Sequence, residues 1–461
     1  MSTQLQPRPG APRGRLSSLV LAGGILMLWL SVHAALMDPA VLQDHAFVPV
    51  VLPGEMLPTL LGASLESLAV LAVHSDGAEP IPFQMDQRDR HGDWVWAVRP
   101  GPHQRASPPL EELADIDPPI PRAGDGYAQD DQDPPGTRLF DANDELVFMA
   151  RDLGSHWPGP LSALGASPVV ELRVRSASFG TDGWVYIGAF HGAPAPRSAR
   201  RYMHYDELRD EVRSPIYAFR FSDTLVALIR DLRVVGKPLV DRLKVRGELV
   251  LALPPPLRRI RFDEEAISGH TEGYIAGPVR IIKRNLARLG LAGGLVKTPG
   301  VTCEHTYYPH YARVPVCISL RFPVRSVHMT VTTDYRDPPF HHIYMGRYPD
   351  PQGDDWIALD TEQVSIISVL SVPEDLRNHI QTRPCICYPQ VGPGQDRAEA
   401  RGYKGAGFAI ASLPECPKGE HVLYGLYLLT PRPYEPGDER LALALRHPDV
   451  QVQVVRVWER P

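Results

Sequence analysis

The stretch Val169-Val-Glu-Leu-Arg-Val-Arg175 alternates between aliphatic and charged residues. In an extended chain, side chains two positions apart lie on the same face. The aliphatic side chains therefore share one face and the charged side chains share the other, as in a half-buried β-strand. The two sets are Val170, Leu172 and Val174, and Glu171, Arg173 and Arg175.

The same period of two recurs along the rest of the chain, whereas helical periodicity is scarce. Only 206–212 and 373–380 are short helix candidates, and 279–291 fits either a helix or a strand. Many short strands separated by turns predict an all-β fold of antiparallel sheets packed as β-sandwiches, with few short helices. The further strand candidates are Gly183–Gly188, Arg313–Phe322, Met329–Thr333, Val422–Leu429 and a last strand from Val450 with a bulge at Val454-Val455.

The composition is that of a globular protein with many stiff loops. The chain has 48 prolines with no collagen-like period, so we expect them in the connections between strands. The formal net charge of −6 over 461 residues argues against a nucleic-acid partner, which requires a basic surface.

The N-terminus has the features of an export signal. Arg8, Arg13 and Arg15 precede an uncharged run over residues 16–37, and Val32-His-Ala34 supplies small residues at signal-peptidase spacing. We expect an extracytoplasmic protein, periplasmic or secreted. The alternative is an uncleaved inner-membrane anchor, because the uncharged run is long enough to span a bilayer. Any membrane contact is expected only through this segment.

Proline-rich breaks suggest the domain organisation. A Pro- and Asp-rich loop near residue 135 and the run Pro254-Pro255-Pro256 are the candidate boundaries. We predict a signal peptide or anchor over 1–34, an N-terminal β-region over 35–135, a central β-sandwich over 136–256, and a C-terminal β-region over 257–461.

All five cysteines lie in the last third of the chain, as expected for local disulfides in an oxidising compartment. Cys317 faces away from the apolar side of its predicted strand, fourteen residues after Cys303, so we predict a Cys303–Cys317 bridge. Either Cys385 or Cys387 is expected to pair with Cys416. Cys385-Ile-Cys387 lacks the two-residue spacer of zinc knuckles, which argues against a zinc site.

An acidic turn precedes the apolar strand 146–150. Its oxygen-bearing side chains are Asp141, Asn143, Asp144 and Glu145, and an upstream acidic stretch adds Asp86, Asp89 and Asp93. Hard oxygen ligands favour Ca²⁺, so the four residues of the turn, from Asp141 to Glu145 without Ala142, form a candidate calcium site. The alternative is a turn whose carboxylates are neutralised by neighbouring arginines, with no metal.

These two segments, Pro82-Phe-Gln-Met-Asp86 and Asp141-Ala-Asn-Asp-Glu-Leu-Val-Phe148, carry a resemblance. Together they resemble a Pro-x-Gln-x-Asp and Asp-x-x-Asp-Glu-Leu-x-Phe pattern of uncharacterised exported bacterial β-sandwich proteins, some found near polysaccharide-degradation systems. The resemblance covers about 40 residues and departs at the long acidic insertion between its halves. It implies an exported β-protein and carries over no catalytic residues.

A basic stretch and an aromatic loop are candidates for ligand binding. Arginine can donate two hydrogen bonds to a carboxylate, and the ring of tyrosine can pack against a sugar ring. This combination suits an anionic glycan. The alternative is a solvated strand face followed by a structural loop. The candidate ligand-binding residues are Arg280, Arg284, Tyr307, Tyr311 and Tyr335.

Histidine, tyrosine and arginine also supply what a polysaccharide lyase needs: a base, a proton donor and a charge neutraliser. The candidate catalytic residues are His305, Tyr308, Arg336 and His342. No nucleophile-elbow, P-loop, dinucleotide-binding or His-Glu-x-x-His motif is present. Our first hypothesis is therefore a module that binds a glycan or a periplasmic protein partner, and our second hypothesis is a lyase. Convergence of the four candidates in one cleft would favour the enzyme.

Overall fold

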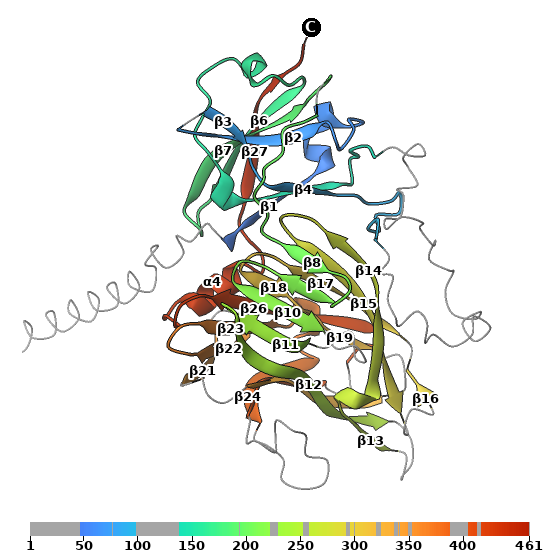
Figure 1. Ribbon diagram of the computed structural model, residues 1–461. Coiled ribbons are helices and arrows are strands. Elements are labelled where there is room, and N and C mark those ends of the chain that lie inside the picture. Colours follow the sequence, from blue (N-terminus) through green and yellow to red (C-terminus); the bar gives the residue numbers. More distant parts are fainter. Residues whose placement is uncertain are drawn as a thin grey trace, which may run out of the picture.

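The computed structural model describes residues 47–75, 77–97, 138–192, 194–221, 229–251, 258–291, 296–298, 300–319, 324–335, 340, 342–348, 353–387, 404–412 and 416–460. These residues form two β-lobes, a smaller one and a larger one (Figure 1). They contain 27 strands in four sheets, and every pairing between these described strands is antiparallel. The predicted all-β class is confirmed.

The small lobe consists of two sheets. One has the strand order β1 (Pro49–Pro53), β5 (Glu145–Met149), β4 (Phe83–Asp86). The other has the order β27 (Gln451–Trp458), β6 (Val169–Ser176), β7 (Thr181–Ala189), β2 (Leu68–His74), β3 (Gly77–Pro80). Their apolar faces share one core, to which Val50, Leu146, Val70 and Leu172 contribute.

The large lobe contains the two largest sheets. The nine-stranded sheet has the order β24 (Ile380–Cys387), β25 (Gly405–Ser412), β20 (Val324–Tyr335), β12 (Lys237–Leu251), β11 (Ile229–Val234), β10 (Tyr217–Phe221), β9 (Glu211–Arg213), β8 (His204–Asp206), with β13 (Arg259–Phe262) paired to β12. The ten-stranded sheet has the order β14 (Ile267–Ala276), β15 (Ile281–Leu291), β17 (Val301–Tyr307), β18 (Tyr311–Arg313), β26 (Glu420–Thr430), β23 (Ser365–Ser371), β22 (Asp355–Asp360), β21 (His342–Arg347), with β16 (Val296–Lys297) on β15 and β19 (Val316–Ser319) on β26.

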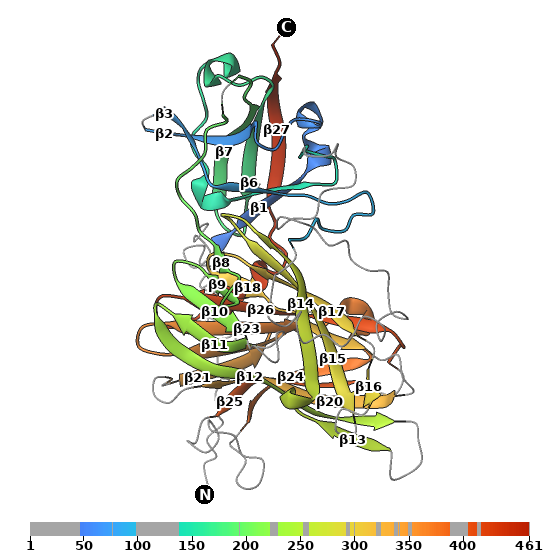
Figure 2. The same cartoon turned by 45° about the vertical axis from the view of Figure 1, so that its right-hand side comes forward.

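Each face of the ten-stranded sheet has a different partner. One face packs against the nine-stranded sheet around Phe219, Val245, Ile281 and Tyr307. On the other face, Tyr311 and Leu428 join the core of the small lobe. The two lobes are therefore held together by a shared apolar core, and β27 returns from the large lobe to complete the small one (Figure 2).

Helices are short in the described part of the chain. The α-helix α4 (Asp438–Ala444) packs against β23 and buries Leu441 and Ala442. The 3-10 helices are η2 (Gly54–Met56), η3 (Pro58–Leu60), η6 (Ala150–Asp152), η7 (Leu161–Leu164), η8 (Glu264–Ala266) and η9 (Glu374–Leu376). None of the helices in these ranges is long and apolar enough to cross a membrane.

The alternation in β6 is confirmed for its aliphatic side, because Val170, Leu172 and Val174 are buried. Glu171, expected in solvent, is fully buried instead. Its carboxylate accepts a hydrogen bond from Arg456 Nε at 3.0 Å, and this charge partner on β27 makes the burial tolerable. The bulge predicted in the last strand is confirmed as a register shift between Val454 and Arg456.

The expected helices and domain boundaries need correction. Residues 206–212 contain the end of β8, a turn over 207–210 and the start of β9, and 279–291 contains strand β15. The 373–380 segment holds only η9. Sheets also cross both predicted boundaries, since β4 pairs with β5 across residue 135 and β12 pairs with β20 across residue 256. Which residues belong to which lobe is determined by the pairing of strands that are distant in the sequence, and local composition does not reveal this pairing.

The predicted Cys303–Cys317 disulfide is present, with a Cα–Cα distance of 6.2 Å. The second predicted bridge is wrong, because Cys385, Cys387 and Cys416 are all free thiols. Cys385 and Cys387 lie on β24 of the nine-stranded sheet, whereas Cys416 precedes β26 of the ten-stranded sheet. The predicted signal segment, residues 1–34, lies outside the described residues, as does the 16–37 anchor.

Candidate functional site

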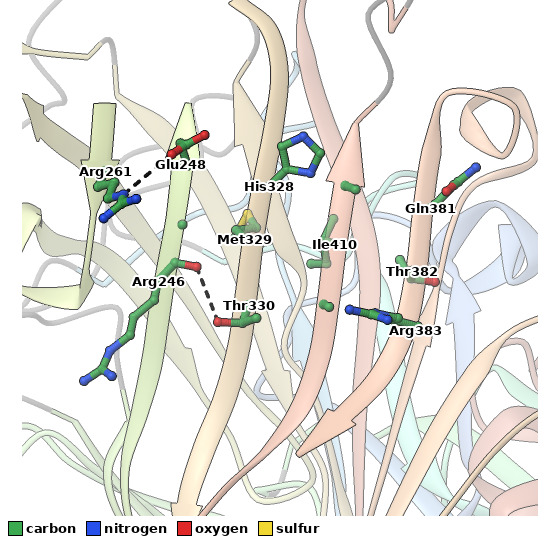
Figure 3. A pocket seen from close by; sticks show the side chains of 13 residues that line it. Arg246, Glu248, Arg261, His328, Met329, Thr330, Gln381, Thr382, Arg383 and Ile410 are labelled. Atoms are coloured by element: carbon green, nitrogen blue, oxygen red, sulfur yellow. Dashed lines mark hydrogen bonds and ion pairs between the residues drawn. The ribbon is translucent and has the colours of Figure 1, made fainter. Parts of the chain in front are cut away.

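A groove of about 680 Å³ crosses the outer face of the nine-stranded sheet, over β13, β12, β20, β25 and β24 (Figure 3). The strand register sets its lining side chains in two rows across the sheet. One row is Glu248, His328, Ala411 and Gln381, and the next is Arg246, Thr330, Ala409 and Arg383. We call this hollow the arginine groove.

The floor of the arginine groove is the strand β25. Its outward positions are all small, Gly405, Gly407, Ala409 and Ala411, while its neighbours carry long side chains. At Gly407 a Cβ would lie 2.1 Å from the carbonyl oxygen of Val331, so only glycine allows this close strand approach. A small-residue strand between strands with longer side chains produces a trough.

The charge of the arginine groove is positive, although the whole chain has a net charge of −6. Its lining has three arginines against one glutamate. Arg246 lies 3.6 Å from Glu264, and Arg261 lies 3.6 Å from Glu248. The Arg383 side chain extends over β25 and makes no hydrogen bond or ion pair with the described residues (Figure 3). Its guanidinium can therefore donate two parallel hydrogen bonds to the carboxylate of a ligand.

Beyond Arg246 the outer face of the sheet continues as a neutral polar strip. Lys244 and Asp334, both almost fully buried, form an ion pair at 2.5 Å. On β24 the next two outward positions are Cys385 and Cys387, which lie opposite Gly407 and Gly405. The outer face of the sheet therefore runs from the charged residues of the arginine groove to two thiols beyond it.

A second hollow, of about 530 Å³, lies over β9, β10 and β11. Arginines line it too, but acids accompany them: Arg209 lies 3.8 Å from Asp206 and Arg233 2.9 Å from Asp231. Arg213 pairs with Glu211. Three of its arginines are thus matched by acids of the chain, whereas the fourth, Arg220, has no ion pair to a described residue, so the second hollow is basic as well.

The acidic turn predicted to bind calcium lies where the two lobes meet. Glu145 accepts ion pairs from Arg280 at 2.6 Å and from Arg88 at 2.8 Å, and buried Asp86 pairs with Arg280 at 2.7 Å. Burial raises the pKa of the Asp86 carboxyl. Burial acts on Glu145 in the same sense, but Arg280 and Arg88 together hold the pKa of Glu145 below its ordinary value.

The rest of the turn is held by hydrogen bonds within the protein. Asp144 accepts the backbone N–H groups of Arg88 and Asp141, both at 2.9 Å. The Asn143 amide donates to the Asp89 carbonyl at 2.7 Å. These contacts and the ion pairs to Arg88 and Arg280 fit the alternative in which neighbouring arginines, and no metal, neutralise the carboxylates of the turn. Among the described residues no group of three or more His, Cys, Asp or Glu side chains could hold a metal. Calcium binding at this turn stays a prediction.

His305 and Tyr307 lie inside the large lobe. The His305 Nδ1 atom lies 3.1 Å from the Tyr307 hydroxyl, and neither side chain is exposed. Burial, with the nearby Lys283 cation, lowers the pKa of His305 to about 3, so its imidazole is neutral at pH 7. Lys283 itself is buried against Asp210 at 2.6 Å. These groups form a structural polar cluster.

The other tyrosines expected to face a sugar are also buried. Tyr308 and Tyr311 stack on each other with ring centroids 4.7 Å apart, inside the core shared by the lobes. Tyr335 lies in the large-lobe core. Arg280 is fully committed to its carboxylates, and Arg284 pairs with Glu304 at 3.1 Å and with Asp93 at 3.3 Å. The predicted binding residues therefore serve mainly the packing of the protein.

The candidate catalytic residues do not converge. His342 is exposed on β21, five strand positions from the β17 residue His305, or about 24 Å at the usual strand spacing. Tyr308 and His305 belong to opposite faces of the ten-stranded sheet. Arg336 lies outside the described residues. The three described candidates share no cleft.

Sequence reasoning missed the residues that line the arginine groove. Three segments alternate as outer strand faces do, and their outward residues are charged, polar or small: Lys244-Val-Arg-Gly-Glu248, Gln381-Thr-Arg383 and Gly405-Ala-Gly-Phe-Ala-Ile-Ala411. This alternation was a usable signal for exposure. It does not tell which strands are neighbours, and the groove depends on that.

No protein-family model matches the chain, and no curated protein matches it. Among solved structures, the chain is similar to an alpha-mannosidase from Enterococcus faecalis V583, with 8% identity and a TM-score of 0.43, over 90% of this chain and 44% of that one. It is also similar to a protein in glycosyl hydrolase family 38 from Enterococcus faecalis, with 8% identity and a TM-score of 0.35, over 64% of this chain and 41% of that one. The chain thus spans less than half the length of either protein.

Proposed function

We propose that this protein is an exported module that binds an anionic, uronate-containing glycan in the arginine groove. The observation that carries the proposal is the Arg383 guanidinium, which extends over the groove without an acid of its own among the described residues. Arg246 and Arg261 place two more guanidinium groups along the same face. Carboxylate groups spaced along a polymer suit such a row.

The remaining lining supports a sugar ligand. Thr330, Gln381 and His328 can exchange hydrogen bonds with sugar hydroxyls. Ala409 and Ala411 form a flat floor on which a ring can lie. The groove is open along its length, which suits a segment of a chain, whereas an enclosed cavity would suit a small molecule.

Export supports the proposal from the sequence side. Arg8, Arg13, Arg15 and the uncharged run after them predict a compartment in which such glycans occur. Mass spectrometry of the protein from its native cell should find a chain starting near Ala35. Intact Met1 in the soluble cytosol would contradict export, whereas intact Met1 in the membrane fraction would select the anchored form.

The experiment is a calorimetric titration with tetragalacturonate and with maltotetraose as its neutral counterpart. We expect the uronate to bind and the neutral sugar not to bind. Because a hydrogen bond to a charged group contributes about 1.5–3 kcal/mol, Arg383→Gln should weaken Kd by roughly 10- to 100-fold. Arg209→Gln, which removes a charge from the second hollow, is the matched control and should leave Kd unchanged.

Two results would overturn the proposal. One is equal affinity for the charged and the neutral oligosaccharide. The other is a Kd for tetragalacturonate that Arg383→Gln and Arg209→Gln change to the same extent, because this would show a general charge effect and no specific groove.

A further inference from the structure

Two free thiols lie side by side on the outer face of the nine-stranded sheet. Cys385 and Cys387 are two residues apart on β24, so both side chains point to the face that carries the arginine groove. They are half-buried and unbridged, while Cys303–Cys317 forms a disulfide in the same lobe. The β25 residues opposite them, Gly407 and Gly405, have no side chain to cover them.

Charged groups near the pair come from three strands of the sheet. Lys244 and Arg246 approach from β12, Asp334 from β20, and Arg383 from β24 itself. The β25 neighbours are glycines and add no charge. Asp334 is bound to Lys244, which leaves Arg246 and Arg383 as the cations at the open end of the strip. Arg246 is shared with Glu264.

We propose that Cys387 is a reactive thiol that forms a mixed disulfide with small anionic disulfides, with Cys385 as its hydrogen-bond donor. Because both side chains lie on the same face of β24, an S–H group donated by Cys385 would stabilise the thiolate form of Cys387. The thiolate is the nucleophile in thiol–disulfide exchange. The proposal does not depend on glycan binding.

The exchange step balances without any further reactant. The Cys387 thiolate attacks one sulfur of a disulfide RS–SR, the S–S bond of the reagent breaks, and a Cys387–S–SR bond forms. The RS⁻ group leaves and takes a proton from water. One disulfide is consumed and one is formed, so no electrons are gained or lost overall.

The titration of the three free cysteines agrees with this assignment. The Cys385 hydrogen bond, opposed by burial and aided by Arg246 and Lys244, lowers the pKa of Cys387 to about 7. The same hydrogen bond and burial raise the pKa of Cys385. Burial also raises the pKa of Cys416. At neutral pH, Cys387 is the free cysteine among these with a substantial thiolate fraction.

The arginines give the site a preference for the charge of the reagent. A disulfide with carboxylates, such as glutathione disulfide, is attracted by Arg246 and Arg383, whereas a cationic disulfide such as cystamine is repelled. Arg383 is exposed and carries no structural ion pair to the described residues, so its replacement tests this preference without disturbing the fold.

The experiment exposes the mildly reduced, desalted protein to glutathione disulfide and, separately, to cystamine between pH 6 and 9. Peptide mass mapping then follows the adduct on each cysteine. We expect Cys387 to react at least tenfold faster than Cys416 at pH 7, with a rate midpoint near pH 7. Cys385→Ala, which removes the donor, should move this midpoint upward, and Cys416→Ala is the control that should not move it. Arg383→Gln should reduce the preference for glutathione disulfide at least threefold.

Other outcomes would overturn the inference. Equal rates for Cys387 and Cys416, or a Cys387 midpoint above pH 8.5, would show an ordinary thiol. If the pH midpoint of adduct formation at Cys387 is unaffected by Cys385→Ala, Cys385 does not act as a hydrogen-bond donor to Cys387. Circular dichroism of each variant verifies its fold. Since tetragalacturonate binding is measured without any disulfide reagent, failure here and failure of the proposed function are separate results.

Discussion

Replacing Arg280 with methionine tests the joint between the lobes. Arg280 precedes β15 of the large lobe, while its partners Asp86 and Glu145 end β4 and begin β5 of the small lobe. In Arg280→Met the carboxylate of Asp86, about 1% exposed, loses its cation. Glu145, whose side chain is 19% exposed, keeps Arg88. Removing one partner of a buried ion pair costs about 3–5 kcal/mol of unfolding free energy.

Urea unfolding followed by tryptophan fluorescence measures this loss, since Trp94 lies against Arg88 and Arg280. Arg284→Met is the matched control. Arg284 faces the same side of the strand, but its partner Asp93 is largely exposed and its partner Glu304 is only half-buried, so we expect a loss below about 1 kcal/mol. Equal losses for the two variants would refute the reasoning.

The pH dependence of the same variant provides a second check. Without Arg280, the folded-state pKa of buried Asp86 rises further above its unfolded value. A carboxyl with a raised folded pKa favours the folded state only while it is protonated, so the deficit of Arg280→Met should shrink as pH falls from 7 toward 4. A deficit that is constant over this range would mean that Asp86 does not carry the cost.

Three further predictions concern single sites. Cys303→Ser opens a fourteen-residue loop and should lower the unfolding free energy by about 3 kcal/mol in urea titrations, while Cys416→Ser should not. His305 has a folded pKa of about 3, so the wild type should lose stability as pH falls from about 6.5, by up to about 1.4 kcal/mol per pH unit, and His305→Gln should flatten this slope. If Ca²⁺ binds the acidic turn, millimolar Ca²⁺ should raise the melting temperature above its value in EDTA, and this rise should be absent in Asp144→Ala. Equal melting temperatures in Ca²⁺ and EDTA would show that Arg88 and Arg280 alone neutralise the carboxylates.

The fold class was predictable because strand alternation is local. Val170, Leu172 and Val174 are buried as their period requires, and the placement of Cys317 opposite the apolar face correctly predicts its bridge to Cys303. Glu171 was not predictable in the same way. Its burial depends on Arg456, nearly 300 residues later in the chain, and only the β6–β27 pairing brings the two together.

The candidate site was predicted poorly for the same reason. Tyr307, Tyr308 and Tyr311 have the chemistry of a sugar platform, but residue type alone does not distinguish a platform from a core. Arg280 has the chemistry of a carboxylate receptor, and it does bind carboxylates, those of Asp86 and Glu145. The arginine groove arises from five strands whose order in the sheet is not their order in the sequence.

The pairing of β27 with β6 makes the small lobe depend on residues 451–458. During synthesis, residues 47–192 emerge well before their fifth strand, so β6 presents an open edge with Val170, Leu172 and Val174 beside it. An unpaired apolar edge invites association with other chains. The sheet of the small lobe is completed only when β27 pairs with β6. Removal of 451–458 should therefore cause aggregation through the lobe built mainly from the first half of the sequence.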